Sequence, residues 1–369
     1  MKTYELIGGS GLESLVLTER PVPEPGPREL LVKLRAVSLN YRDLAILRGT
    51  YGDYPRPLVP VSDGVGEVVA VGAEVRRFKV GERVIPAYVP DWIRGGPTEE
   101  NSRRRLGGPL DGLLREYACI HEEAAVAAPA HLTDAEAATL PIAGVTAWHA
   151  LLTAGRVRPG DTVVVQGTGG VSLFALQLAR MAGARVLVTS RSPAKLERAV
   201  ALGAAAGIHT GAEPEWDARV LSLTEGRGAD HVVDVVGGEG VGRSIGAARV
   251  GGTVTLVGFL DSAAVSFDLT RALRRVVRLQ AVSVGSREDL EALGRALSVR
   301  GVRPVVDRTF SFAEAHAAYA YRPVGRNSGR WSSPCLEPSE AREAETVSPG
   351  CGTVNYQSRS VKRQWMSWA

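Results

Sequence analysis

Cysteine is scarce in this sequence of 369 residues, with three in all: Cys119, Cys335 and Cys351. No two of them form a C-x-x-C pair, and so few thiols cannot build a disulfide framework. This usage fits a reducing compartment, and we expect a cytoplasmic protein. The sequence also lacks an N-terminal signal-peptide pattern and any apolar run long enough to span a bilayer. These absences argue against a disulfide-rich secreted protein and against a membrane protein.

A concentrated charge and a metal-binding pattern are missing as well. The net charge is +4, and residues 322–369 hold seven Lys or Arg against four Asp or Glu, so most of the excess lies at that end. This gives no argument for nucleic acid as a partner. Cys119 is better interpreted as a small buried apolar side chain. We expect no metal site, because none of the histidines stands in a ligand spacing: His121, His131, His149, His209, His231 and His316.

What the sequence does contain is a strand, a glycine turn and a helix in residues 162–180, TVVVQGTGGVSLFALQLAR. Gly167-x-Gly169-x-x-Ser172 matches the dinucleotide fingerprint G-x-G-x-x-G, except that serine replaces the third glycine. Such a turn lets a pyrophosphate approach the N–H groups at a helix start. An ordinary strand–helix connection would look similar, but the strand before and the helix after favour nucleotide binding. The predicted cofactor contacts here are Gly167, Thr168, Gly169, Gly170 and Val171.

The end of the next strand indicates which cofactor binds. NAD-binding proteins place an acidic residue there, about 20 residues after the first glycine, to hold the ribose hydroxyls. The sequence at residues 189–195, TSRSPAK, contains no acid. Ser190, Arg191 and Lys195 can instead contact a 2′-phosphate, although a solvated helix start would have the same composition. We therefore predict NADP(H).

Strands and helices alternate from residue 162 to residue 284, with six strands in all. This order predicts an α/β fold, a doubly wound parallel Rossmann sheet, and we place that domain at residues 123–285. Residues 1–122 are rich in Val, Gly and Pro in short alternating runs, which predicts a β-rich domain. Residues 286–327 follow the Rossmann domain, and residues 328–369 lose the periodic apolar pattern, so we expect a disordered tail there.

A polar run, SLNYRD at residues 38–43, follows a predicted strand. Asn40 or Asp43 is suited to capping the next helix, and capping is the preferred interpretation for Asp43. A tyrosine beside a cofactor can donate a proton or a hydrogen bond to a developing oxyanion. The pattern alone leaves this role open for Tyr41 and Tyr51.

Seven segments together resemble the medium-chain dehydrogenase/reductase superfamily, in its zinc-independent quinone oxidoreductase-like branch, and the resemblance covers residues 5–327. The resemblance implies a GroES-like catalytic domain at residues 1–122, the Rossmann domain, and a C-terminal return to the first domain, with NADPH and substrate in the cleft between. The segments are SLNYRD (38–43), PLVPVSDGVGEVVAVG (57–72), FKVGERV (78–84), LPIAGVTAWHAL (140–151), VVVQGTGGVSLFALQLA (163–179), KLERAVALGA (195–204) and GRGADHVVDVVGG (226–238).

The resemblance also bears on zinc. Zinc alcohol dehydrogenases of this superfamily have a cysteine where this chain has Asn40 and a His-Glu pair where it has Ser62-Asp63. Their third ligand falls near Ala143. None of these ligands is retained, so the resemblance implies a reaction without zinc.

What remains implied is hydride transfer from NADPH to a quinone or to the double bond of an α,β-unsaturated carbonyl, with an enolate that needs hydrogen-bond donors and a proton. Tyr51 is implied as the donor, with Asn40 and Tyr41 near the reacting centre. Two alternatives stay open: an NADP-dependent alcohol dehydrogenase or aldehyde reductase acting without zinc, and a non-catalytic NADPH-binding protein. The residues implied to line the nicotinamide side are Thr146, Gly258, Phe259 and Ser283.

The resemblance further implies a small-molecule substrate and a homodimer. Family members commonly pair their sixth Rossmann strands edge to edge, and residues 276–284 would form that edge here. Pairing would hide the exposed strand from aggregation.

The C-terminal end departs from the family, which usually ends soon after a run such as N-F-G-K-V-V. Here residues 327–333 read NSGRWSS. Codons for F-G-K-V-V-V that lose one base read S-G-R-W-S-S, so we hypothesise a one-base frameshift near Asn327, with loss of the final strand of the catalytic domain. Sequencing the gene is expected to show the shifted frame, and an intact frame across this point would contradict the hypothesis.

Overall fold

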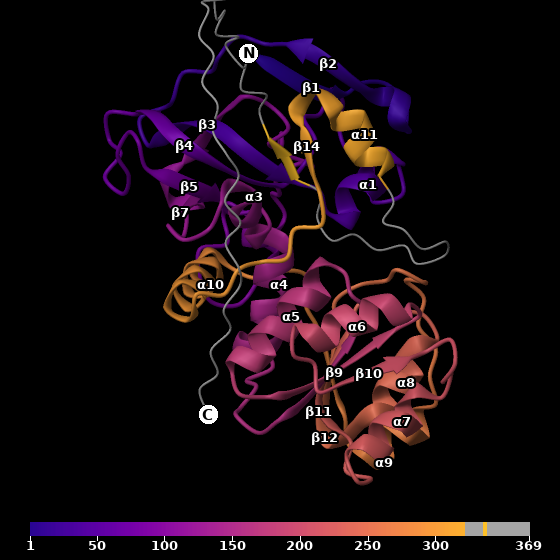
Figure 1. Cartoon of the computed structure of the whole chain (residues 1–369). Coiled ribbons are helices and arrows are strands. Elements are labelled where there is room, and N and C mark those ends of the chain that lie inside the picture. The colour runs from indigo at the N-terminus through magenta and orange to yellow at the C-terminus, as the bar shows by residue number, and fades with distance from the viewer. Residues whose placement is uncertain (322–334, 338–369) are drawn as a thin grey trace, which may run out of the picture. The chain divides into compact units, whose positions relative to one another are not determined.

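The computed structural model describes residues 1–321 and 335–337 of the chain (Figure 1). Its six-stranded sheet has the strand order β10-β9-β8-β11-β12-β13, with every pairing parallel. This is the doubly wound order, so the predicted Rossmann fold is confirmed. The strands are β8 (Thr162–Gln166), β9 (Arg185–Ser190), β10 (Ala206–His209), β11 (Ala229–Asp234), β12 (Ala248–Leu256) and β13 (Arg278–Ala281).

Helices cover both faces of this sheet, and β8 shows how. Val163 and Val165 pack into one apolar cluster with Phe174 of α5 (Gly170–Met181). Val164, which points to the opposite face, packs into another cluster with residues of α7 (Trp216–Leu223) and α8 (Gly240–Ala247). A strand buried on both faces has no polar alternation, which explains its uninterrupted valine run. The remaining helices around the sheet are α6 (Pro193–Ala201) and α9 (Leu269–Arg275).

The N-terminal part is GroES-like and β-rich. Among the described residues its main sheet has seven strands in the order β14-β15-β3-β4-β5-β7, with β6 also beside β3. A separate two-stranded sheet pairs β1 with β2. The strands are β1 (Lys2–Leu6), β2 (Leu15–Glu19), β3 (Glu29–Ser38), β4 (Asp63–Val71), β5 (Arg83–Pro86), β6 (Tyr117–His121), β7 (Ala125–Ala127), β14 (Thr309–Ser311) and β15 (Cys335–Glu337).

Short helices connect and complete these sheets. A capping box of Thr133 and Glu136 begins α3 (Asp134–Ala137). The apolar stretch that follows is wound partly as π-helix, over 140–144 and 149–153, on either side of α4 (Val145–Trp148). The other helices are α1 (Tyr41–Leu47), α2 (Glu99–Ser102), α10 (Arg287–Arg300) and α11 (Ala315–Ala320). None of the described helices is long and apolar enough to cross a membrane.

The sixth Rossmann strand is shorter than predicted. Residues 276–284 were expected to be extended, but β13 begins at Arg278 because Val276 takes a left-handed conformation, with φ 47°, where α9 ends. In the described sheet β13 does form the edge, and Leu279 is partly exposed on it. Pairing of two copies along this edge stays a prediction, which sedimentation of the purified chain would test.

The expectation of disorder from residue 328 onward is corrected at residues 335–337, which form β15. This strand pairs with Val37 and Ser38 of β3, beyond the point where β6 stops pairing at Lys33. β15 can form because this part of β3 has an open edge with which it pairs. Leu336 packs into the adjoining core and is 2% exposed. The rest of the predicted tail and the proposed frame change lie outside the described residues.

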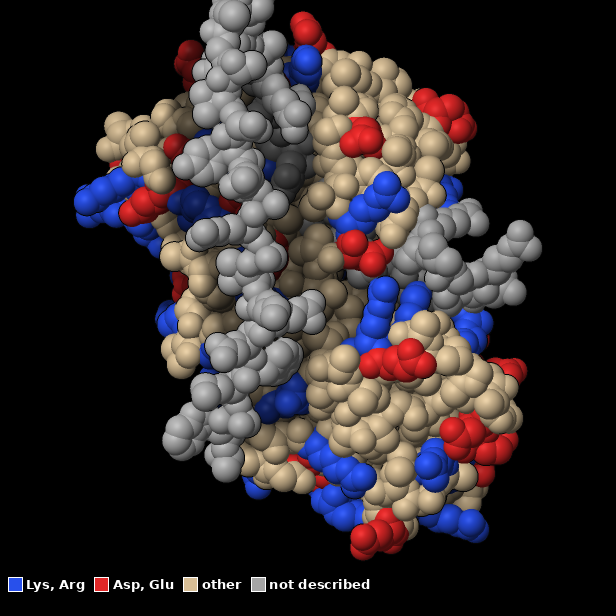
Figure 2. All heavy atoms as spheres, viewed as in Figure 1, with Lys and Arg blue, Asp and Glu red and all other residues tan. Residues whose placement is uncertain are grey.

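Basic and acidic side chains are interspersed on the face drawn in Figure 2, among many uncharged residues. This distribution agrees with the small net charge of the sequence. That nucleic acid is not a partner stays a prediction.

Candidate active site

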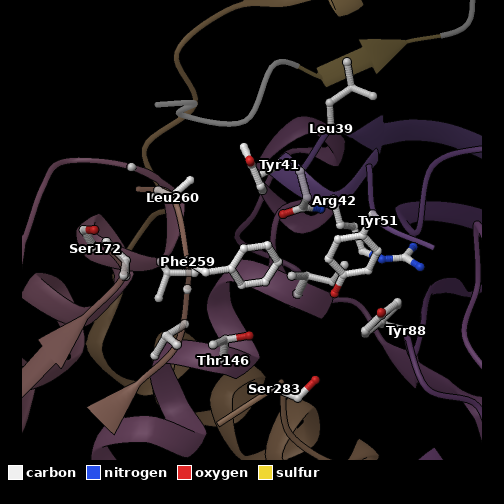
Figure 3. A pocket seen from close by; sticks show the side chains of 18 residues that line it. Leu39, Tyr41, Arg42, Tyr51, Tyr88, Thr146, Ser172, Phe259, Leu260 and Ser283 are labelled. Atoms are coloured by element: carbon white, nitrogen blue, oxygen red, sulfur yellow. The ribbon is translucent and has the colours of Figure 1, made fainter. Parts of the chain in front are cut away.

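Two pockets lie at the carboxyl ends of the parallel strands. The central pocket has a volume of about 180 Å³, and Leu260 lines both it and the second pocket. Strand order reverses between β8 and β11, and ligands of open α/β sheets bind in the crevice at such a point. The central pocket is lined by Leu39, Asn40, Tyr41, Arg42, Tyr51, Tyr88, Ile142, Thr146, Gly169, Gly170, Val171, Ser172, Val235, Val257, Gly258, Phe259, Leu260 and Ser283 (Figure 3).

Every site residue predicted from the sequence lines one of these pockets, while the role of each stays a prediction. The predicted cofactor-choosing residues gather with two residues of the glycine turn in the second pocket: Gly167, Thr168, Ser190, Arg191 and Lys195. The others line the central pocket: Asn40, Tyr41, Tyr51, Thr146, Gly169, Gly170, Val171, Gly258, Phe259 and Ser283.

The glycine turn has the geometry that a bound pyrophosphate needs. Gly167 takes a left-handed conformation, with φ 72°, which favours glycine. Ser172 donates its hydroxyl to the Gln166 carbonyl at 2.7 Å, so serine at the third fingerprint position ties α5 to the end of β8. Gly169 caps α5 without a side chain, and the first-turn N–H groups therefore have no side-chain acceptor. A nucleotide phosphate would fit these donors.

The second pocket suits an additional phosphate. Ser190 ends β9, Arg191 follows it, and Lys195 lies in the first turns of α6. Asp261 is the one carboxylate among the described lining residues, and it comes from the loop after β12 rather than from the end of β9. The acid position that holds a ribose in NAD-binding proteins is thus occupied by Ser190.

The loops on the central pocket are held by Asp234 at the end of β11. Its Oδ1 accepts hydrogen bonds from the N–H groups of Val236 and Gly237, both at 2.9 Å, and its Oδ2 accepts one from Ser244 at 2.6 Å. The Asp234 carbonyl also accepts from the Val257 N–H at 2.8 Å. Next to it, a Cβ on Gly258 would lie 2.6 Å from the Val235 carbonyl, so only glycine fits there. These contacts fix the backbone position of Phe259, the residue after Gly258.

A fully buried carboxyl group, that of Asp63, lies behind the pocket wall. Its Oδ2 accepts hydrogen bonds from Asn40 Nδ2 at 2.9 Å and from the Ile142 N–H at 3.0 Å, while its Oδ1 has no partner among the described residues. Burial raises the pKa of Asp63 well above its ordinary value. Asn40 is thereby tied to Asp63, and it also forms a capping box with Asp43 at the start of α1.

The side chains at the zinc positions of related enzymes do not form a zinc site. Asn40 presents its N–H₂ group to Asp63, which uses one carboxylate oxygen to accept N–H groups. Ser62 donates its hydroxyl to Asp43 at 3.2 Å. Within residues 1–321 and 335–337 no group of three or more His, Cys, Asp or Glu could hold a metal ion. Zinc sites in proteins are built from Cys, His and carboxylate ligands, and a reaction without zinc stays a prediction.

Sequence reasoning missed Arg42 and Tyr88. Arg42 is 6% exposed and donates hydrogen bonds to the Leu106 and Gly108 carbonyls, both at 2.9 Å, with the Asp43 carboxylate 3.9 Å away. Its guanidinium carbon lies 5.0 Å from the ring centroid of Tyr88 and 5.5 Å from that of Tyr51. The segment SLNYRD contained Arg42, but nothing in the pattern shows that it turns inward. The predicted role of Asp43 agrees with its acceptance of the Asn40 backbone N–H at 2.8 Å.

Hydroxyl groups of three residues point into the central pocket: Tyr51, Thr146 and Ser283 (Figure 3). The Thr146 Oγ1 atom is buried and has no hydrogen-bond partner within the described part of the chain. A buried hydroxyl without a partner is costly, so a bound molecule that pairs with it gains affinity. The pocket therefore offers hydrogen-bond donors inside a largely apolar wall.

Known proteins share this architecture. The family model described as "Alcohol dehydrogenase GroES-like domain" matches residues 26–130, and that described as "Zinc-binding dehydrogenase" matches residues 170–298. A zinc-type alcohol dehydrogenase-like protein of Schizosaccharomyces pombe is 39% identical over 321 residues, which cover 85% of this chain and 93% of that protein. A quinone oxidoreductase of Pseudomonas aeruginosa is 35% identical over 240 residues, covering 64% of this chain and 66% of that protein.

A solved structure agrees as well. The crystal structure of a Sinorhizobium meliloti 1021 protein, provisionally named an alcohol dehydrogenase, superposes with a TM-score of 0.83 at 42% identity. The match covers 91% of this chain and 99% of that chain. Fold, pockets and matches together define an oxidoreductase class with a GroES-like and a Rossmann-like domain. The chain belongs to the medium-chain dehydrogenase/reductase superfamily, whose members bind a nicotinamide cofactor.

Replacing Asp63 by asparagine is expected to change how stability depends on pH. A raised pKa in the folded protein gives wild type a stabilising contribution that is full below the unfolded value near pH ~4 and is lost as pH rises. Asp63→Asn has no titrating group at this position. The free energy of unfolding of the variant should therefore increase relative to that of wild type as the pH rises above ~4. Titration of this single carboxyl group changes the difference in free energy of unfolding between variant and wild type by at most about 1.4 kcal/mol per pH unit.

Urea unfolding between pH 4 and 8 measures this difference. Replacement of the exposed Asp53 by asparagine controls for the loss of one carboxylate and should track wild type. A difference between Asp63→Asn and wild type that stays constant across the range would contradict the burial argument.

Proposed function

We propose that this chain is an NADPH-dependent oxidoreductase that reduces a quinone or an α,β-unsaturated carbonyl compound without zinc. The observation that carries the proposal is the central pocket, in which the hydroxyls of Tyr51, Thr146 and Ser283 face an apolar cavity beside the uncapped start of α5. The bound nicotinamide supplies the hydride. The chain then has to bind the acceptor, stabilise the charge that develops on its oxygen and supply a proton.

Tyr51 is the proposed donor. When a hydride adds to the β-carbon of a conjugated carbonyl, the electron pair of the double bond moves towards the oxygen, which becomes an enolate. The Tyr51 hydroxyl donates a hydrogen bond and then a proton, which Tyr51 regains from water at the pocket mouth. We assign a binding role to Asn40 and Tyr41, because both line the central pocket and Asn40 is held in place by Asp63.

Asp63 and Asn40 support the part of the proposal that concerns zinc. An alcohol dehydrogenase that uses zinc polarises its substrate oxygen with the metal, whereas here Asn40 is hydrogen-bonded to Asp63 and Ser62 to Asp43. The S. pombe relative carries zinc in its description and the P. aeruginosa relative is described as a quinone oxidoreductase, so similarity alone does not choose between them. The scarce cysteines support a reducing, cytoplasmic setting.

An acceptor panel tests the reaction. Purified protein with NADPH is expected to reduce a quinone or an open-chain enone faster than an aldehyde. The rate is measured as the loss of NADPH absorbance. Turnover with the aldehyde alone would favour the alcohol dehydrogenase alternative, and tight NADPH binding without turnover would favour a non-catalytic protein.

Tyr51→Phe should lower kcat about a hundredfold, the effect of losing one oxyanion donor. Tyr54→Phe, which changes a nearby tyrosine outside the central pocket, is the matched control.

The cofactor preference is tested by binding. The double variant Arg191→Ala, Lys195→Ala is expected to weaken NADPH binding about tenfold or more, because charge-assisted contacts to the 2′-phosphate are lost. NADH, which lacks that phosphate, should bind wild type and variant alike. Arg198→Ala, on the exposed side of α6, controls for loss of positive charge. Quenching of protein fluorescence gives both dissociation constants, and an equal loss of NADH and NADPH affinity would argue against NADP(H) selection.

A further inference from the structure

Tyr51, the proposed proton donor, lies on a loop whose backbone does little to hold it. The loop follows α1, and residues 51–57 make no backbone–backbone hydrogen bond within the described part of the chain. Gly49 and Gly52, close to Tyr51 on either side, are exposed and take left-handed conformations with φ 70° and 113°. Contacts of the Tyr51 ring are therefore needed to keep its hydroxyl at the central pocket.

The buried side chain next to this ring is Arg42 (Figure 3). Its guanidinium carbon lies 5.5 Å from the Tyr51 ring centroid, within the roughly 6 Å at which an aromatic ring attracts a cation. Arg42 is 6% exposed, and this attraction grows when water is excluded. Phe259 also contacts Tyr51, with 6.2 Å between the ring centroids, but Phe259 is 43% exposed and less firmly held. Arg42 is thus the contact that can fix the tyrosine.

Three hydrogen bonds in turn fix the guanidinium of Arg42. Its terminal N–H groups donate to the Leu106 and Gly108 carbonyls, both at 2.9 Å, and to the Ser62 hydroxyl. A planar fork that is bound at several acceptors keeps one orientation, whereas the ammonium of a lysine is a point charge on a long stem. Because these N–H groups turn towards the chain, Arg42 acts on the acceptor through Tyr51 rather than by touching it.

Tyr88 ties the same arrangement together from a second segment. Its ring centroid lies 5.0 Å from the Arg42 guanidinium carbon, and its side chain is 5% exposed. The Tyr88 carbonyl accepts a hydrogen bond from the Leu106 N–H at 3.0 Å, so the segment that holds Arg42 is itself held. Arg42 therefore contacts two tyrosine rings of the central pocket from a position that the packing leaves no room to change.

We infer that Arg42 is the positioning residue of Tyr51 and that it holds the tyrosine ring so that its hydroxyl faces the central pocket. The inference rests on the proposed function in one respect, namely that Tyr51 is the donor to the acceptor oxygen. Such a donor is effective only if it is in place before the reaction, since a misplacement of about 1 Å costs up to about a hundredfold in rate. The holding of the ring itself is a property of the free protein and is measured without turnover.

A double-mutant cycle measures whether Arg42 acts through Tyr51. Arg42→Lys keeps a positive charge near the buried Asp43 but loses the planar fork, and it should lower kcat about tenfold with the fastest acceptor of the panel. In the Tyr51→Phe background the same change should lower kcat less than about twofold, because the hydroxyl that it misplaces is gone. An equal fall in both backgrounds, or no fall with Tyr51 present, would overturn the inference.

Two further variants complete the cycle. Arg83→Lys changes another hydrogen-bonded arginine of the GroES-like part, outside the central pocket, and should leave kcat as in wild type. Ser62→Ala removes one acceptor of Arg42 without leaving an unpaired charge, so it replaces Arg42→Lys if that variant does not fold. Ser62→Ala should lower kcat about twofold to threefold with Tyr51 present and leave it unchanged in the Tyr51→Phe background. Equal falls in both backgrounds would again overturn the inference.

Fluorine NMR follows the ring without turnover. In protein labelled with 3-fluorotyrosine, the Tyr51 signal is identified by its absence from Tyr51→Phe, and its shift between H₂O and D₂O reports how far water reaches the ring. Arg42→Lys or Ser62→Ala should enlarge this shift for Tyr51 and leave that of Tyr117, on β6, as in wild type. A larger shift would support the positioning role even in a chain that reduces no acceptor. An unchanged Tyr51 shift would overturn that role even in an active reductase.

Discussion

The reversal of strand order between β8 and β11 is the constraint on which the site depends. Crossover helices run outward in both directions from this point, so none covers the carboxyl ends of the two strands. The loops after β8, β11 and β12 consequently open on one crevice. Asp234 makes that crevice rigid, since its side chain holds the loop after its own strand and its carbonyl holds the loop after β12.

The opposite wall depends on buried charge. Around Asn40 the chain keeps two buried carboxyl groups, Asp43 and Asp63, with one buried guanidinium, Arg42. Burying such groups is unfavourable unless hydrogen bonds satisfy them. Arg42 satisfies the requirement through backbone carbonyls and Asp63 through N–H donors, although one Asp63 oxygen is left over. The wall is thus made of side chains whose positions are fixed by each other, without a metal ligand set.

Prediction from the sequence succeeded where the signal is local. The valine run of β8, the glycine turn and α5 follow each other within twenty residues, so pattern and motif identify them. The cofactor choice read from the acid-free end of β9 stays a prediction. Arg42 and Tyr88 were missed because they meet only through tertiary packing of α1 against a loop far along the chain. The strand β15 was missed for a related reason, since three residues become a strand only when the open edge of β3 is beside them.

The two walls of the crevice therefore differ in how far they can be predicted from the sequence. The Rossmann wall consists largely of backbone, with the glycines and strand ends that the sequence motif identifies. The opposite wall consists of side chains of the GroES-like part, and the buried Arg42 lies against the ring of Tyr51. Phe259 belongs to the first wall by its position after β12 and to the second by its contact with Tyr51. A residue that contacts both walls contributes to the shape of the central pocket from either side.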